Sequence, residues 1–272
     1  NGVNGRDAII AANQDADLNI ELTSSTSEGA LSALTMKSES TIFNTEDGQD
    51  LEVTGDVTLE SAPGTTPRTS LSIVNRALEA QGDLIVGGDI TASARSQIRM
   101  AASIPGDGRG TPPTPLEGDI TVTGDIEFSG SESRVILGFE DDGTPAVGNI
   151  LSAQNVTFGS GSTLALAATS TSGGNVTLSG NLTLDGTLDS NLGSTFTFNG
   201  GSSQTVSGSA LSVDFPNADV ASGSDVDVTS DINFQTEDTE TLTIDNQGTI
   251  DLSNLEFSTA SGSGDVSLSG NA

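Results

Sequence analysis

The sequence predicts an all-β protein, and within that class a parallel β-solenoid, a rod in which the chain winds through stacked strands. Three observations favour it. Short runs of alternating apolar residues dominate the chain, and Gly, Asn, Asp and Ser interrupt them at short intervals. One short motif also recurs six times. A helical spacing of apolar residues is confined to two short segments, 7–13 and 71–81.

The repeated motif is an acid or amide, an apolar-x-apolar triplet, a spacer, glycine, a second acid or amide, and a second such triplet. Asp119-Ile-Thr-Val-Thr-Gly-Asp-Ile-Glu-Phe128 is a full copy. In the fifth copy Ser230 replaces the glycine, and the sixth stops at Ala272 before its second strand. The starts are 33, 36, 56, 50 and 40 residues apart, at Asp50, Asp83, Asp119, Asn175, Asp225 and Asp265.

Each copy predicts a strand, a tight corner and a second strand. Alternation turns one face of each strand inward. Glycine with Asp or Asn is expected to supply a left-handed corner, which β-branched residues adopt at a cost. Because such a unit cannot bury its apolar face alone, the copies are expected to stack. Phe128 and Phe234 hold the same motif position, which predicts rings stacked in the core.

Two architectures fit this pattern. A solenoid with coils of about 20–25 residues would place one motif in every second coil. The chain would then form about a dozen coils and a rod of roughly 55–60 Å. The alternative is a β-sandwich or jelly roll, in which the Gly-Asp corners are hairpin turns.

The expected organisation is one elongated repeat domain over residues 1–272. Within it, residues 1–45 are an N-terminal capping or subunit-joining segment. Residues 105–116 hold the densest proline cluster and are expected to form a projecting loop.

Composition excludes several classes of function. Eight Lys and Arg against 38 Asp and Glu give a net charge of −30, which argues against binding to nucleic acid or anionic membranes. The chain has no Cys, His, Trp or Tyr, so thiol chemistry, Ser-His-Asp catalysis and Cys- or His-ligated metals are excluded. All eight bases lie at or before Arg134, leaving residues 135–272 with 17 acids and no base. We therefore expect no enzyme activity and no membrane insertion.

Two acid clusters are the candidate chemical sites. Their carboxylates could be oxygen ligands for calcium, a catalytic pair for glycoside hydrolysis, or a solvated acidic loop. A lyase-like β-helix would also need a base, and Arg134 is the base nearest in sequence. Calcium is the only cofactor the clusters suggest, and they consist of Glu140, Asp141, Asp142, Glu237, Asp238 and Glu240.

The corner acids would form two columns if the copies stack in register. Such columns could bind cations, or they could serve side-chain-to-backbone hydrogen bonds in the turns. The expected members are Asp50, Asp83, Asp119, Asn175, Asp225 and Asp265 in one column, and Asp56, Asp89, Asp125, Asn181, Asp231 and Asn271 in the other. Asn155, Asn175 and Asn181 also begin glycosylation triplets.

The strings from Gly173 to Gly186 and from Gly82 to Ile90 resemble bacterial surface β-solenoids. The similar families are the filamentous-haemagglutinin-type adhesins and the autotransporter passenger repeats. The resemblance implies an extracellular, non-enzymatic rod. The chain departs from those families in its short length and irregular period.

The unfinished sixth motif suggests how copies would join. Its strand would leave an open edge, and apolar-x-apolar segments near residues 7–22 could complete it. This predicts a head-to-tail homopolymer, since such an interface does not close on itself. The joining residues would be Ala8, Ile9, Ile10, Val266, Leu268 and Ala272.

The expected function is therefore a structural protein outside the cell or on its surface, as a filament subunit or adhesin rod that could also contact surface glycans. The alternatives are a carbohydrate-active β-helix enzyme or glycan-binding module, and a pilin-like sandwich joined by strand donation.

Overall fold

The structure is a computed structural model of the chain. It describes residues 7–11, 18–21, 31–37, 40–44, 50–60, 69–74, 82–101, 118–139, 150–169, 172–189, 194–208, 212–213, 217–229, 232–236, 241–246, 248–251, 255–259 and 265–270. All elements in these ranges are β-strands.

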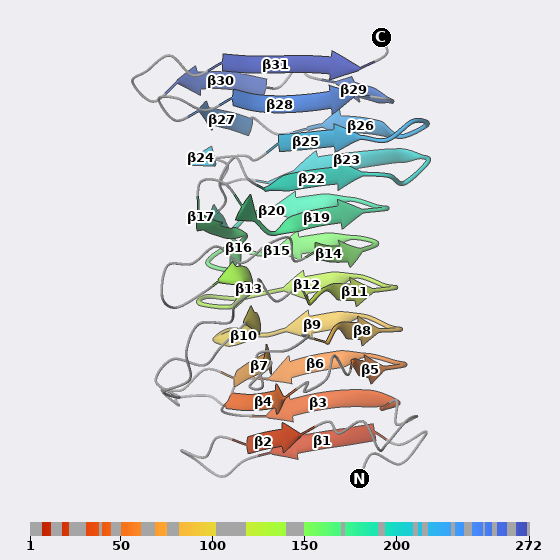
Figure 1. The fold of residues 1–272 in the computed structure, drawn as a ribbon, viewed down its shortest axis with the longest axis vertical. Helices are drawn as coiled ribbons and strands as arrows, with labels where there is room; N and C mark the ends of the chain where they lie inside the picture. Colours follow the sequence, from red (N-terminus) through yellow and green to blue (C-terminus); the bar gives the residue numbers. More distant parts are fainter. Residues whose placement is uncertain are drawn as a thin grey trace.

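The strands form a parallel β-solenoid, drawn in Figure 1 as a stack of coils from the N-terminal end to the C-terminal end. Each full coil passes through three sheets in a fixed order, which we call C, A and B. Consecutive coils pair in parallel, as Leu51 with Leu84 and Val57 with Ile90 show. A sandwich or jelly roll is built from antiparallel sheets, so that alternative is wrong.

Sheet A is the longest, with ten strands. At about 4.8 Å per strand its nine spacings make roughly 43 Å of rod. Its strands in order are β1 (Asp7–Ala11), β3 (Ala33–Lys37), β6 (Val57–Glu60), β9 (Ile90–Ala92), β12 (Ile126–Phe128), β15 (Val156–Phe158), β20 (Leu182–Leu184), β23 (Ser203–Ser207), β26 (Asp225–Val228) and β29 (Thr249–Asp251).

Sheet C has nine strands and precedes sheet A in each coil. Leu31 bridges Val53 and so extends sheet C by one further coil. The strands are β5 (Leu51–Val53), β8 (Leu84–Val86), β11 (Ile120–Val122), β14 (Ile150–Ala153), β19 (Asn175–Leu178), β22 (Thr195–Phe198), β25 (Asn217–Val220), β28 (Thr241–Asn246) and β31 (Asp265–Gly270).

Sheet B has seven strands, and a three-stranded sheet lies next to its last strand. Sheet B holds β2 (Leu18–Glu21), β4 (Ser40–Asn44), β7 (Thr69–Val74), β10 (Ser96–Ala101), β13 (Arg134–Phe139), β16 (Thr163–Ala165) and β21 (Thr187–Asp189). The three-stranded sheet holds β24 (Ser212–Val213), β27 (Ile232–Thr236) and β30 (Leu255–Thr259), and the small antiparallel pair is β17 (Ala167–Thr169) with β18 (Ser172–Gly173).

The core consists of apolar columns that run along the rod axis. In most strands whose side-chain burial is described, alternate residues are buried, and they meet the equivalent residues of the next coil. Phe128 and Phe158 are such register partners, and their rings stack with centroids 5.3 Å apart. Phe196 and Phe198 stack within one strand at 6.5 Å. The expected stacking of rings in the core is confirmed for Phe128, whose partner is Phe158. Phe234 lies in the three-stranded sheet, where it pairs with Phe257.

Three further expectations need correction. The described parts of the two segments with helical spacing are strands: residues 7–11 form β1 and residues 71–74 lie in β7, while residues 12–13 and 75–81 lie outside the described residues. Register partners in consecutive coils are between 20 and 38 residues apart, so the coils are more variable than expected. The motif also occupies consecutive coils, since Asp50, Asp83 and Asp119 follow one another.

The fifth motif copy is displaced by one side of the coil. Its first strand is β26 in sheet A, and its second is β27 in the three-stranded sheet. In the copies at Asp50 and Asp83 the first strand lies in sheet C instead. Each side of the coil uses the same apolar-x-apolar strand and polar corner, so the motif alone does not indicate which side a strand occupies.

The described parts of residues 1–45 are β1 to β4 and the Leu31 bridge, and they lie in the same sheets as the following coils. Residues 105–116 fall outside the described residues.

Candidate functional site

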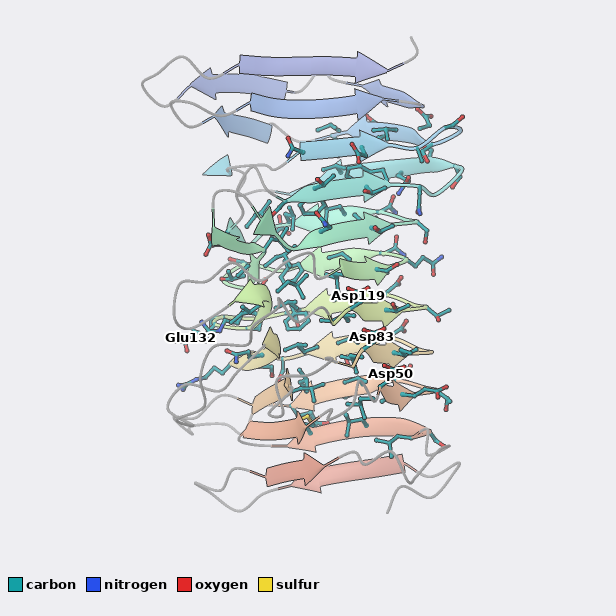
Figure 2. The ribbon with its side chains drawn as sticks, viewed as in Figure 1. Asp50, Asp83, Asp119 and Glu132 are labelled. Carbon is teal, nitrogen blue, oxygen red and sulfur yellow. The ribbon has the colours of Figure 1, made fainter. Side chains whose placement is uncertain are left out.

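Two columns of Asp and Asn run along the rod. The first column stands at the start of sheet C and holds Asp50, Asp83 and Asp119, which lie one above the other in Figure 2. The second column stands at the corner between sheets C and A, six residues later in the chain in these three coils. It holds Asp56, Asp89, Asp125, Asn155 and Asn181.

The second column is a continuous hydrogen-bond ladder. In each coil the backbone N–H donates to the Oδ1 atom of the column residue one coil earlier. Asp89 donates to Asp56 at 3.0 Å, and Asp125 donates to Asp89 at 2.8 Å. The ladder continues from Asn155 to Asp125 at 3.1 Å, from Asn181 to Asn155 at 2.6 Å, and from Thr205 to Asn181 at 2.8 Å.

The first column uses the same bond. The backbone N–H of Asp83 donates to Oδ1 of Asp50, and that of Asp119 to Oδ1 of Asp83, both at 2.9 Å. Ile150 interrupts the column in the next coil. It resumes at Asn175, whose Oδ1 accepts from the N–H of Thr195 at 3.0 Å.

These bonds define what the corner residues do in the described coils. Each uses a side-chain oxygen to bind the backbone of the next coil, and Asp and Asn both do so. The bond therefore requires an acceptor oxygen rather than a negative charge. Of the two roles expected, hydrogen bonding to the backbone is the one seen, although the partner is the next coil instead of the residue's own turn. Each such bond is worth about 0.5–1.5 kcal/mol net.

Glycine precedes Asp in the corner because space is required, not because of a left-handed backbone. A Cβ on Gly88 would overlap Oδ1 of Asp56, and one on Gly124 would overlap Oδ1 of Asp89. Among the described glycines, the left-handed ones lie elsewhere: Gly130, Gly161, Gly201, Gly208 and Gly223. The expected conformational reason for the motif glycine is therefore wrong.

The same corner carries a ladder of backbone hydrogen bonds. The N–H of Gly88 donates to the carbonyl oxygen of Gly55 at 3.0 Å, and Gly124 donates to Gly88 at 3.1 Å. Gln154 then donates to Gly124 at 2.9 Å, and Gly180 to Gln154 at 2.7 Å. The turn itself is thus hydrogen-bonded from coil to coil.

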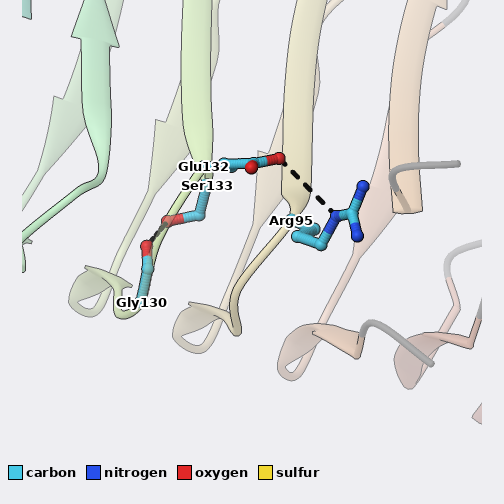
Figure 3. A network of polar contacts seen from close by, with 4 residues as sticks. All are labelled: Arg95, Gly130, Glu132 and Ser133. Carbon is cyan, nitrogen blue, oxygen red and sulfur yellow. Dashed lines mark hydrogen bonds and ion pairs between the residues drawn. The ribbon is translucent and has the colours of Figure 1, made fainter. Parts of the chain in front are cut away.

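The corner between sheets A and B is built differently. Arg95 and Glu132 occupy equivalent positions in consecutive coils, with φ angles of 62° and 64°. Gly161 occupies this position in the following coil, with a φ angle of 81°. Their side chains form an ion pair with Nε to Oε2 at 3.6 Å, shown in Figure 3. The Arg95 side chain is half-buried and the Glu132 side chain is exposed to solvent, so this pair adds little stability.

Beside this pair lies a column of buried serines. Ser96, Ser133 and Ser162 are fully buried, and each hydroxyl donates to a backbone carbonyl oxygen. Arg134 lies one residue beyond Ser133 and donates from Nε to Oε1 of Gln97 at 2.6 Å. The serines therefore satisfy backbone carbonyl acceptors at this corner.

The structure brings together only part of the predicted columns. Asp225 lies in sheet A, not in sheet C with Asp50. Asp265 pairs with Thr241 and is not in the first column. In these two coils the column positions are occupied by Thr243 and Ser267, each two residues later in the chain. Asp231 and Asn271 lie outside the described residues.

The remaining predicted residues are placed as follows. Ala8, Ile9 and Ile10 lie in β1 and pair with β3, while Val266 and Leu268 lie in β31 and pair with β28. Ala272 and both acid clusters, Glu140, Asp141, Asp142, Glu237, Asp238 and Glu240, lie outside the described residues. In the parts of the chain that the structure describes, no three Asp, Glu, His or Cys residues are grouped to hold a metal ion.

No protein-family model, curated protein or solved structure matches this chain. The described ranges also contain no helix that is long and apolar enough to cross a bilayer. The functional argument therefore rests on the geometry of the coils.

Sequence reasoning missed two members of the second column, Asn155 and Thr205. The coil of Asn155 has Gln154 in place of the motif glycine and one residue fewer between the columns, so a search for the full motif passes over it. Its apolar-x-apolar triplet, Val156-Thr-Phe158, was the signal that could have located it.

Replacing Asp89 tests the ladder. Asp89→Ala removes the acceptor of the Asp125 N–H and is expected to lower the free energy of unfolding by about 1 kcal/mol. Asp89→Asn keeps an acceptor and relieves repulsion from Asp56 and Asp125, so in low salt it should be more stable than the parent by up to about 1 kcal/mol. Salt should reduce that gain. Urea titrations at two salt concentrations measure both effects, and equal stability of the two variants would contradict the ladder.

Proposed function

We propose that this chain is a non-enzymatic structural rod that works outside the cell or on its surface, as a filament subunit or adhesin shaft. The observation that carries the proposal is the coil-to-coil connection. Consecutive coils are joined by strand pairing in the sheets, by apolar columns inside, and by side-chain ladders at the corners. Such connections are expected in a protein that forms a rigid rod of fixed length and does not unfold from its ends.

The surface chemistry supports the same role. Outward-facing residues of sheet A are mostly hydroxyl-bearing or acidic, and Thr58 and Thr91 contact each other across coils at 3.4 Å. A net charge of −30 keeps such a rod dispersed and repels anionic partners.

The first and last described strands lie in sheets that follow one another in the coil order. The first described coil has strands in sheets A and B, β1 and β2. The last described strand, β31, lies in sheet C and has one described partner strand, β28. We propose that copies join end to end, with β1 of one copy pairing with β29 of another and so continuing sheet A.

Electron microscopy and sedimentation of the purified chain test the proposal. We expect fibres at about 0.5 M salt and weaker assembly at about 0.02 M, where repulsion between copies is less screened. Val266→Pro, which disrupts strand pairing in β31, should abolish fibres, while Val266→Ile should keep them. A monodisperse monomer at high protein and salt concentrations, with no fibres on the grid, would refute end-to-end assembly.

A further inference from the structure

The corner between β22 and β23 contains a chemically labile pair, Asn199-Gly200. The chain has three Asn-Gly pairs, at 1–2, 4–5 and 199–200, and the last lies in the described residues. Such pairs deamidate spontaneously because glycine leaves the following backbone nitrogen sterically open to the Asn side chain. Asn199 is exposed, so its carboxamide is accessible to water.

Gln204 holds the nitrogen that would react. The N–H of Gly200 donates to Oε1 of Gln204 at 2.9 Å. The Gln204 side chain is fully buried, although its register partner in the next coil is the apolar Val226. Its Nε2 donates to the carbonyl oxygens of Leu178 at 3.1 Å and Gly180 at 2.7 Å. A buried amide with three bonds is fixed in place, and so is the N–H that it accepts.

We propose that Asn199 is a deamidation site and that Gln204 is the positioning residue that sets its rate. In the reaction the Gly200 nitrogen loses its proton and bonds to Cγ of Asn199. The Cγ–Nδ2 bond breaks, and ammonia leaves with the proton. Water then opens the resulting succinimide ring to aspartate or isoaspartate. No oxidant, reductant or second protein is required.

The geometry opposes the first step. The proton of the Gly200 N–H must be removed, but it is hydrogen-bonded to the neutral, buried Oε1 atom of Gln204. Hydroxide cannot reach it there. The backbone of Asn199 is held as well, because its N–H donates to the carbonyl oxygen of Leu178 at 2.9 Å. Reaction therefore requires the corner to open locally.

Deamidation would alter the rod at this point. It adds one negative charge to a chain that already carries −30. Isoaspartate also adds a methylene to the backbone between β22 and β23, so the bond from Asn199 to Leu178 and the register of the corner could not both persist. In a long-lived rod, deamidation would therefore disturb the coil-to-coil contact at this corner, a consequence that goes beyond the proposed function and does not depend on filament formation.

The test is peptide mapping by mass spectrometry after incubation of the full chain at mildly alkaline pH. Native wild-type protein should form aspartate and isoaspartate at Asn199 at least about tenfold more slowly than the same chain unfolded in urea. Gln204→Met, which keeps the volume and loses all three bonds, should raise the native rate about 10- to 100-fold. Circular dichroism checks that the variant is folded.

Val226→Ala is the matched control. It creates a cavity beside Gln204 in the next coil and leaves the Gly200 bond intact. Its rate at Asn199 should stay within a fewfold of wild type. The proposal is overturned if native and unfolded wild type deamidate at the same rate, if folded Gln204→Met matches wild type, or if Val226→Ala accelerates the reaction as much as Gln204→Met does.

Discussion

Phe158→Ala is expected to lower the free energy of unfolding by about 3–5 kcal/mol. Phe158 is fully buried in the middle of sheet A, between register partners Phe128 and Leu184. Truncation leaves a cavity that strands fixed by hydrogen bonds on both sides cannot collapse to fill. It also removes the ring stacked on Phe128 at an interplanar angle of 14°. Urea titration followed by circular dichroism measures the loss.

Phe158→Leu separates volume from ring stacking. Leucine already occupies the same column at Leu184, so the cost should fall to about 1–2 kcal/mol. A double-mutant cycle between Phe128 and Phe158 should give a coupling of about 0.5–1.5 kcal/mol. A loss below about 1 kcal/mol for Phe158→Ala would mean that this ring is not part of a packed core.

Gly124→Ala should lower the free energy of unfolding strongly, by about 2–4 kcal/mol. The added Cβ would overlap Oδ1 of Asp89 and would crowd the carbonyl oxygen of Gly88 at 2.8 Å. Neither can withdraw easily, because Asp89 accepts from the Asp125 N–H and the Gly88 carbonyl accepts from Gly124 itself. The variant should therefore weaken both the side-chain ladder through Asp89 and the backbone ladder through Gly88.

Gly159→Ala is its control. Gly159 follows the sheet A strand β15, and the nearest neighbour of an added Cβ would be the Phe128 carbonyl oxygen at 3.4 Å, an ordinary contact. We expect a change within about 0.5 kcal/mol. Asp89→Ala in the Gly124→Ala background should recover part of the loss. If the two glycine variants were equally stable, the corner would not be as tightly packed as the structure shows.

Much of the solenoid is visible in the sequence. Alternation in segments such as Leu51-Glu-Val53 and Ile126-Glu-Phe128 determines which side chains face inward, and the structure buries those expected. Asp and Asn before each strand also lie where stacking would place them in the coils of Asp50, Asp83 and Asp119. These features are local, since a strand's own side-chain alternation fixes its apolar face.

The sequence motif did not predict which of the three sheets a given strand would join. The motif at Asp225 has the same apolar-x-apolar pattern as the one at Asp50, yet the two begin in different sheets. The coil containing Asn155 joined the ladder without the motif glycine. The pairing of strands between coils depends on the number of residues in each connecting segment. A local sequence pattern does not determine that number.

The sequence by itself determined that this chain is an acidic all-β repeat whose strands must stack, because no single unit can bury its own apolar face. Only the tertiary structure decided what the corner residues do. The Asp89 side-chain oxygen accepts a hydrogen bond from the backbone N–H of Asp125, 36 residues away, and Gly124 is glycine because that oxygen lies beside it. Such roles exist only between coils, so they follow from the register of the stack and not from the order of residues within one turn.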